Sequence, residues 1–241
     1  LLMMALIDGG LIYSVINHQA FPSSLFFIAI LFISLLISMI GGRVIPMFVA
    51  NKLGIQKVIE PQLIFLLSIL PLPLLMLIQL MNPFPGSDII SSLLCIFLVM
   101  GHGSRVKLWF HKGILLQPML WSLWLFYACL PLGFLTLAFE AYVPGIGSIA
   151  LHVITVGAIS GLISAMVSRV SLGHTGRNIT HDKWIVLAFG LLFVSLLIRT
   201  LGIVLLGFSS QLIGLSALLF SLAFGVIFAR FVMVWISPRA S

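Results

Sequence analysis

The chain has 241 residues, of which 61% are hydrophobic and only 7% are charged, and its mean hydropathy is +1.29. Because a soluble domain normally carries about 25% charged residues, this composition excludes an ordinary soluble protein and predicts one that crosses a lipid bilayer several times. The formal net charge is +7. The basic residues are nevertheless dispersed at the ends of apolar runs, where topology signals lie, and therefore do not indicate a nucleic-acid partner.

Eight mainly apolar runs follow one another along the chain, with short polar segments between them. A helix rises about 1.5 Å per residue, so each run can cross a hydrocarbon core of roughly 30 Å. We expect a single all-α transmembrane domain over residues 1–241, a polytopic helix bundle that forms the C-terminal part of a longer chain. Its helices are expected over residues 1–16, 24–41, 62–80, 89–104, 118–139, 148–170, 184–206 and 211–236. Pro71 and Pro73 predict a kink in the third helix.

The distribution of basic residues predicts the orientation of the helices. Lysine and arginine occur in every second loop and in the C-terminal tail: Arg43, Lys52 and Lys57, then Arg105, Lys107 and Lys112, then Arg169, Arg177 and Lys183, and finally Arg239. The loops between them contain no basic residue, only Asp88 and Glu140. Because short cytoplasmic loops carry the excess of positive charge, we expect the basic loops and the C-terminus to be cytoplasmic.

The stretch from Leu151 to Arg177, LHVITVGAISGLISAMVSRVSLGHTGR, concentrates more polar chemistry at one membrane boundary than any other segment. On a helical wheel its small residues fall on one side, where they permit close approach of another helix: Gly157, Gly161, Ser164, Ala165 and Ser168. His152 falls on the other side, together with Thr155, Ile159, Ile163 and Met166. The sequence therefore predicts that His152 points towards wider space, which a cofactor, a cavity or another helix can fill.

The same stretch carries a family resemblance, because HVITVGAISG followed by SRVSLGHTGR resembles the NnrS family of bacterial membrane proteins. GGRVIPMFVAN, from Gly41 to Asn51, looks like the second marker of that family, and the run from Trp109 to Gly133 is similar in layout. The resemblance covers the chain from about Gly41 to the last helix. The motif residues to which it gives no role are Gly41, Gly42, Arg43, Pro46, Asn51, Thr155, Gly157, Arg169, Gly173, Thr175, Gly176 and Arg177.

Members of that family are haem- and copper-containing membrane proteins connected with the response to nitric oxide. The resemblance therefore implies a protein of the bacterial cytoplasmic membrane with haem as its cofactor, copper as a second metal to consider, and nitric oxide as its small ligand. Haem iron and Cu(I) are the groups through which a protein can hold this neutral gas, which gives the association a physical basis. Composition and residue spacing alone do not predict a cofactor.

The predicted orientation sorts the histidines into an outer layer, with His18 and His152, and a cytoplasmic layer, with His102, His111, His174 and His181. Both axial ligands of a haem iron come from one layer, so His102 and His152 are not expected to form a pair. We predict that His152 is an axial ligand of a haem in the outer half of the membrane, because neutral imidazole binds iron and copper well. The alternative is a histidine that only forms a hydrogen bond with a neighbouring helix.

Arg199 lies in the outer half of the seventh predicted helix, where a charge is costly and marks a functional site by default. A haem propionate is one candidate partner, because the guanidinium matches a carboxylate. The alternative partner is Asp8.

The cytoplasmic layer offers His102 and His174, each beside glycine and arginine at a predicted helix end. They predict either a polar helix end at the lipid headgroups or a second metal site, with Arg43, Arg169 and Arg177 supplying positive charge. Four methionines are candidate soft copper ligands or packing residues: Met39, Met47, Met100 and Met166. The two cysteines, Cys95 and Cys129, are expected to be small buried hydrophobes.

Two rival classes remain beside the cofactor protein. A cofactor-free transporter or channel for a small solute would account for the prolines in the third and fifth helices and for the arginine at depth. A structural or assembly subunit would use His152 only to hold helices together. Haem content separates the first class from both rivals.

Overall fold

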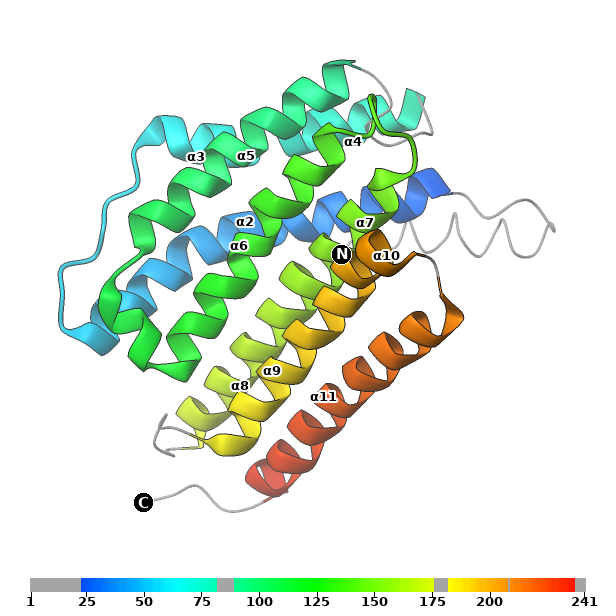
Figure 1. Ribbon diagram of the computed structural model, residues 1–241. Helices are drawn as coiled ribbons and strands as arrows, with labels where there is room; N and C mark the ends of the chain where they lie inside the picture. The colour runs from blue at the N-terminus through cyan, green and yellow to red at the C-terminus, as the bar shows by residue number, and fades with distance from the viewer. Residues whose placement is uncertain (1–22, 82–88, 176–181, 208, 237–241) are drawn as a thin grey trace.

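The computed structural model describes residues 23–81, 89–175, 182–207 and 209–236 (Figure 1). Every regular element in these ranges is helical, and seven helices among them are long and apolar enough to cross a membrane. This confirms the all-α membrane fold class. The helix expected over residues 1–16 lies outside the described residues.

The elements in chain order are α2 (Ser23–Leu53), α3 (Gln62–Ile69), α4 (Pro71–Met81), α5 (Ile89–Trp109), η1 (Lys112–Leu116), α6 (Pro118–Ala138), α7 (Ile146–His152), η2 (Val153–Ser160), α8 (Gly161–His174), α9 (Lys183–Leu197), η3 (Ile198–Gly202), α10 (Ile203–Leu206) and α11 (Ser210–Ile236). Of the short segments, η1 is a 3₁₀ helix, and η2 and η3 are π-helical. The predicted break in the third span is confirmed, because α3 ends at Ile69 and α4 begins at Pro71.

Two predicted helix ends are wrong. The second helix does not stop at Gly41 and Gly42 but continues as α2 through Pro46 to Leu53. The fourth does not stop at residue 104, because α5 runs to Trp109. Glycine and arginine suggested polar boundaries at both places, whereas the two helices use these residues to pack against each other.

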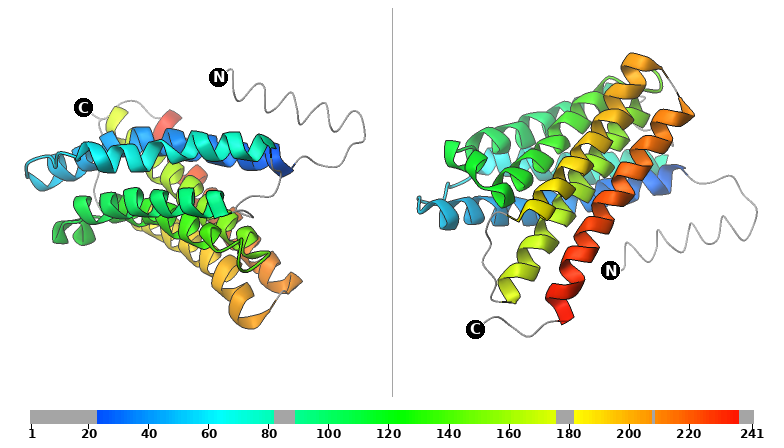
Figure 2. Two further views of the ribbon diagram at one scale, coloured as in Figure 1. Left: turned by 90° about the horizontal axis from the view of Figure 1, so that it is seen from above. Right: turned by 60° about the horizontal axis from the view of Figure 1, so that its bottom comes forward.

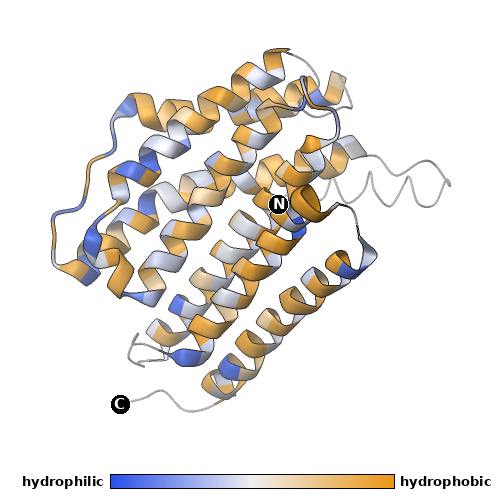
Figure 3. Ribbon diagram, in the orientation of Figure 1, coloured by the Kyte–Doolittle hydropathy of each residue, from blue (hydrophilic) through white to orange (hydrophobic). Residues whose placement is uncertain are grey.

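The helices are arranged in successive rows. Seen from above, α2 and the α3–α4 pair form one row, and α5 and α6 form the next (Figure 2, left). The helices α8, α9 and α11 run side by side across the other part of the bundle (Figure 1). Long hydrophobic stretches cover most of the helices, and hydrophilic residues lie mainly near their ends (Figure 3). Many large apolar side chains are exposed on the outer surface, as expected for helices that face lipid.

The sixth span is not one uniform α-helix, because α7, η2 and α8 follow each other without a break from Ile146 to His174. Its small face nevertheless packs as predicted. A Cβ atom at Gly157 would lie 2.9 Å from Cys129 Sγ of α6, and one at Gly161 would overlap the ring of Phe126. Ser164, Ala165 and Ser168 on the same face are buried. The prediction that this face contacts another helix is confirmed.

Replacement of Gly161 by leucine should destabilise the bundle by about 1–3 kcal/mol, because the added atoms meet the Phe126 ring. The thermal midpoint of the full-length protein in detergent measures this effect. Gly190→Leu is the matched control, since nothing lies within 4 Å of a Cβ atom at Gly190. Equal midpoints for the two variants would contradict the packing described for α6.

Candidate functional site

The two residues predicted to bind a cofactor line the same cavity. His152 ends α7 and Arg199 lies in η3, and both border a cavity of about 330 Å³. Helix α11 forms the other wall. The complete lining consists of His152, Thr155, Val156, Ser195, Arg199, Ser216, Ala217, Phe220 and Ser221. Of the seven other lining side chains, four carry a hydroxyl and one is aromatic, so the cavity offers hydrogen-bonding groups together with apolar surface.

The imidazole of His152 is oriented by the backbone of its own helix. Its Nδ1 atom lies 2.6 Å from the carbonyl oxygen of Ser148. A carbonyl oxygen only accepts, so Nδ1 carries the hydrogen and donates it. In neutral imidazole this leaves the lone pair on Nε2, for which no hydrogen bond is found in the part of the chain that the structure describes. Metal-binding histidines usually have this form: one ring nitrogen donates a hydrogen bond that fixes the ring, and the other nitrogen offers its lone pair to the metal.

Arg199 brings a positive charge to this cavity. Within residues 23–236, apart from the undescribed gaps, no ion pair or hydrogen bond of its side chain is found. Its alternative partner, Asp8, lies outside the described residues. Nearby, Ser195 of α9 and Ser216 of α11 each donate to the other's backbone carbonyl oxygen, at 2.8 and 3.1 Å. This reciprocal pair holds α9 against α11 at the cavity wall.

Both sides of the cavity contain π-helical turns. The segment η2 begins directly after His152, and η3 contains Arg199. Within η2, Ser160 Oγ donates to the carbonyl oxygen of Thr155, five residues earlier, at 2.9 Å. Single π-helical turns are rare inside α-helices and frequently mark functional sites. His152, Thr155 and Arg199 lie in or directly beside these segments, and all three border the cavity.

A second polar cluster lies inside the bundle around Arg105 of α5, which has no exposed surface. Its Nε atom forms an ion pair with Glu60 Oε1, and its Nη2 donates to Oε2 at 3.2 Å. Its Nη1 donates to the carbonyl oxygen and to Oγ of Ser38, both at 2.8 Å, and to Tyr127 Oη at 3.0 Å. The sequence placed Arg105 in a basic loop, which is wrong, because the guanidinium joins α2, α5, α6 and the loop before α3.

His102 belongs to this cluster, and its hydrogen bonds differ from those of His152. Tyr127 Oη lies 2.8 Å from His102 Nδ1 and accepts from Arg105 Nη1, and a phenol oxygen that already accepts one hydrogen bond can still donate its own hydrogen or accept a second. The Nε2 atom of His102 is buried without a hydrogen-bond partner among the described residues. The hydroxyl partner of His102 is compatible with either tautomer, whereas the carbonyl partner of His152 is compatible with only one. His102 is fully buried rather than at a helix end among headgroups.

Comparison with protein families identifies the chain. A family model described as NnrS protein matches residues 1–239. The chain belongs to the NnrS family. Comparisons with curated proteins and with solved structures gave no match.

The first NnrS motif, GGRVIPMFVAN, acquires a structural role from the Arg105 cluster. A Cβ atom at Gly42 would lie 2.9 Å from Arg105 Nη2, and one at Gly41 would lie 3.2 Å from the Tyr127 ring. The two glycines therefore give α2 the space that the guanidinium and the phenol require. Pro46 is buried, whereas Arg43 and Asn51 are exposed.

The two NnrS motifs meet through a cation–π contact. The guanidinium carbon of Arg169 lies 3.7 Å from the centre of the Phe48 ring, so α8 is joined to α2 at this end of the bundle. Thr175 donates to the carbonyl oxygen of Ser171 at 2.7 Å and ends α8, and Gly173 is exposed. Gly176, Arg177 and the side chain of His174 lie outside what the structure describes.

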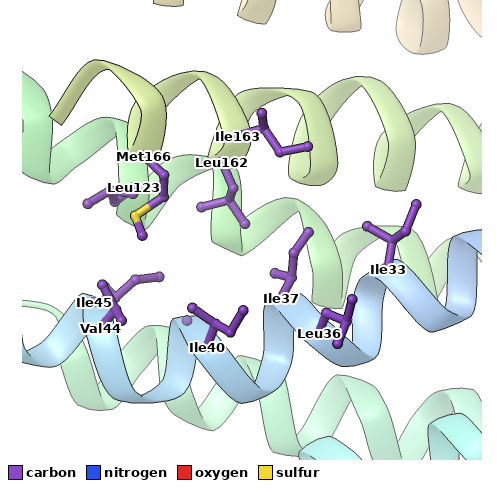
Figure 4. A pocket seen from close by; sticks show the side chains of 11 residues that line it. Ile33, Leu36, Ile37, Ile40, Val44, Ile45, Leu123, Leu162, Ile163 and Met166 are labelled. Atoms are coloured by element: carbon purple, nitrogen blue, oxygen red, sulfur yellow. The ribbon is translucent and has the colours of Figure 1, made fainter. Parts of the chain in front are cut away.

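No group of three or more histidine, cysteine or acidic side chains is placed to hold a metal within the described ranges. Met39, Met47 and Met100 are exposed on the outer surface. Met166 lines a groove of about 250 Å³ between α2, α6 and α8 (Figure 4). The other residues of that groove are aliphatic or glycine: Ile33, Leu36, Ile37, Ile40, Gly41, Val44, Ile45, Leu123, Leu162 and Ile163. These surroundings favour packing for Met166, because they provide no further copper ligand.

Sequence reasoning missed Glu60 and Tyr127, and it missed the structural role of Arg105. Two signals were available. Glu60 is the only acidic residue in a loop that otherwise carries Lys52 and Lys57. His102 and Arg105 are three residues apart, a spacing that places them on one helix face if the helix continues beyond residue 104.

Loss of the carboxylate partner of Arg105 should strongly destabilise the protein. Glu60→Ala leaves a buried guanidinium without its counter-charge, which should cost about 3–5 kcal/mol of unfolding free energy. The control is Arg230→Gln, which breaks the Arg230–Asp182 pair, where the arginine side chain is 38% exposed. That change should cost about 1 kcal/mol or less. Thermal unfolding of both variants in detergent measures the difference, and comparable losses would contradict the role given to burial.

Proposed function

We propose that this NnrS-family protein binds haem in the His152–Arg199 cavity and takes part in the response of a bacterium to nitric oxide. The observation that carries the proposal is the hydrogen bond from His152 Nδ1 to the Ser148 carbonyl oxygen, which leaves the Nε2 lone pair available beside the cavity. One imidazole lone pair is sufficient for axial ligation of haem iron. Family membership supports the choice of cofactor.

The residues around the cavity fit such a group. Ligand pockets in proteins commonly have volumes of roughly 300–1,000 Å³, and this cavity measures about 330 Å³. His152 would ligate the iron, and Arg199 would pair with a propionate through its planar guanidinium. The aromatic ring of Phe220 and the side chains of Val156 and Ala217 provide apolar contact surface. When bound, the haem supplies the iron that can bind nitric oxide.

The protein's own contribution is to fix the ligand and to balance charge. The Ser148 carbonyl keeps the imidazole of His152 in the tautomer that has an available Nε2 lone pair. Arg199 provides a cation inside an apolar bundle, where a carboxylate gains most from pairing. Copper is part of the family's chemistry, but the described residues do not fit a multidentate copper site, and we assign none.

The experiment is the visible spectrum of the detergent-purified full-length protein before and after addition of nitric oxide. We expect a Soret band that shifts with nitric oxide, and we expect His152→Ala to lose most of its bound haem because the axial nitrogen is removed. His174→Ala, at the opposite end of the same span, is the control and should retain the haem. A colourless protein would favour the transporter or channel, and haem loss only with His174→Ala would place the ligand elsewhere.

We also propose that the protein lies in the bacterial cytoplasmic membrane with its basic loops and C-terminus in the cytoplasm. The loop with Lys57 and the segment η1 with Lys112 lie at one end of the bundle, where Leu53 approaches Gly113. The turn between α6 and α7, which contains Glu140 and no basic residue, lies at the other end of α6. This separation of charge supports the orientation.

Cysteine labelling tests the orientation at two exposed positions, Lys57 and Tyr142. Each is changed to cysteine in a background in which Cys95 and Cys129 are alanine. In intact cells an impermeant thiol reagent should label position 142 from outside, and position 57 only after the membrane is opened. Labelling of position 57 but not 142 in intact cells would show that the orientation is reversed.

A further inference from the structure

We propose that Glu140 is a positioning residue for His152 and acts through the first turn of α7. This inference rests on the proposed role of His152 and adds a second residue on which that role depends. Glu140 is the only aspartate, glutamate, lysine or arginine between Lys112 and Arg169. A single carboxylate in so apolar a stretch requires a partner, and the structure provides one in the backbone.

The carboxylate of Glu140 spans the turn between α6 and α7. Its Oε1 accepts the backbone N–H of Gly145 at 2.9 Å, and its Oε2 accepts the backbone N–H of Gly147. These N–H groups belong to the start of α7, where the first four donors of a helix have no partner within the helix. The N-cap residue is Gly145, which has no side chain to supply a cap. Glu140 therefore provides the cap from the preceding turn, and its negative charge also suits a helix N-terminus.

The backbone of this turn is shaped to receive the carboxylate. Gly145 has a φ of 93°, a conformation that L side chains rarely adopt. A Cβ atom at Gly147 would lie 2.9 Å from Glu140 Oε2, so a larger residue would separate the carboxylate from the helix start. Backbone bonds from Tyr142 and Val143 to the Phe139 carbonyl oxygen, at 2.9 and 2.8 Å, close the turn. The carboxylate and the two glycines thus form one fitted unit.

The turn that Glu140 caps contains the hydrogen-bond acceptor for His152. Ser148 follows Gly147 directly, and its carbonyl oxygen lies 2.6 Å from His152 Nδ1. Helix α7 has only seven residues before the π-helical segment η2 begins, so its first turn has little stability of its own. Without the cap the first turn can open and release the Ser148 carbonyl. The imidazole would then lose the bond that selects its tautomer and fixes its ring.

The experiment uses the full-length protein without haem, in detergent, with isotope-labelled histidine. Protonated and unprotonated imidazole nitrogens have well-separated chemical shifts, so nuclear magnetic resonance reports the tautomer directly. The spectra are recorded at a pH at which imidazole is uncharged, and His152→Gln identifies the resonances. In the wild type we expect one Nδ1-protonated form. In Glu140→Ala we expect both resonances to move towards the average of the two tautomers.

Two further variants separate positioning from general stability. Glu140→Gln keeps one acceptor oxygen, so its His152 chemical shifts should lie between those of the wild type and those of Glu140→Ala. If the alanine variant does not fold, the glutamine variant decides the question. Asp182→Ala removes the carboxylate that caps α9 by accepting from Trp184 N at 3.0 Å, and it should leave the His152 resonances unchanged. Wild-type resonances in Glu140→Ala, or in Glu140→Gln if only that variant folds, would overturn the inference and assign the ring position to packing alone.

Haem binding then tests whether the position of His152 that Glu140 maintains matters for the cofactor. Loss of a partner that orients a metal ligand typically lowers affinity about 10–100-fold, and we expect a loss in that range for Glu140→Ala. A wild-type protein that binds no haem would contradict the proposed function, whereas the tautomer measurement on the haem-free protein would still decide the role of Glu140.

Discussion

The buried guanidinium of Arg105 is the constraint to which most of this fold responds. Arginine keeps its charge in proteins, so burial inside a membrane bundle requires both a counter-charge and acceptors for its N–H groups. Glu60 supplies the charge, and Ser38 and Tyr127 supply acceptors. These three partners come from three different parts of the chain, and Arg105 itself lies in a fourth. Satisfying one side chain therefore fixes the positions of α2, α5, α6 and the loop before α3 relative to one another.

Small residues make this arrangement possible. Gly41 and Gly42 bring α2 close enough to enclose the guanidinium, and Gly101 of α5 packs against the backbone of α3, where a Cβ atom would lie 2.6 Å from Ser68 N. In lipid, helices gain little from burying apolar surface against one another, so close backbone approach and satisfied polar groups carry more of the association. Gly41 and Gly42 of the first motif therefore serve packing around a charge. Neither lines the proposed cofactor cavity, which lies between η2, η3 and α11.

The two histidines of interest show how a hydrogen-bond partner decides what an imidazole can do. His152 donates to a carbonyl oxygen and keeps its Nε2 lone pair. His102 shares a hydrogen bond with the hydroxyl of Tyr127, a group that can donate or accept. The residue type is the same at both positions, but only the partner of His152 selects one tautomer and leaves a defined Nε2 lone pair. The partner of His102 comes from a residue far away in the sequence, whereas the partner of His152 comes from the start of its own helix.

The sequence by itself determined the membrane class, because a chain with so few charges and such long apolar runs is suited to lipid and not to water. It also determined the small face at Gly157 and Gly161, since helical spacing is a local property. It failed at Gly42 and Arg105, where glycine and arginine resemble a helix end until the partner helix is known. Only the tertiary structure decided that His152 and Arg199 line one cavity, because the two residues lie on different helices and no local pattern of residues records how those helices pack.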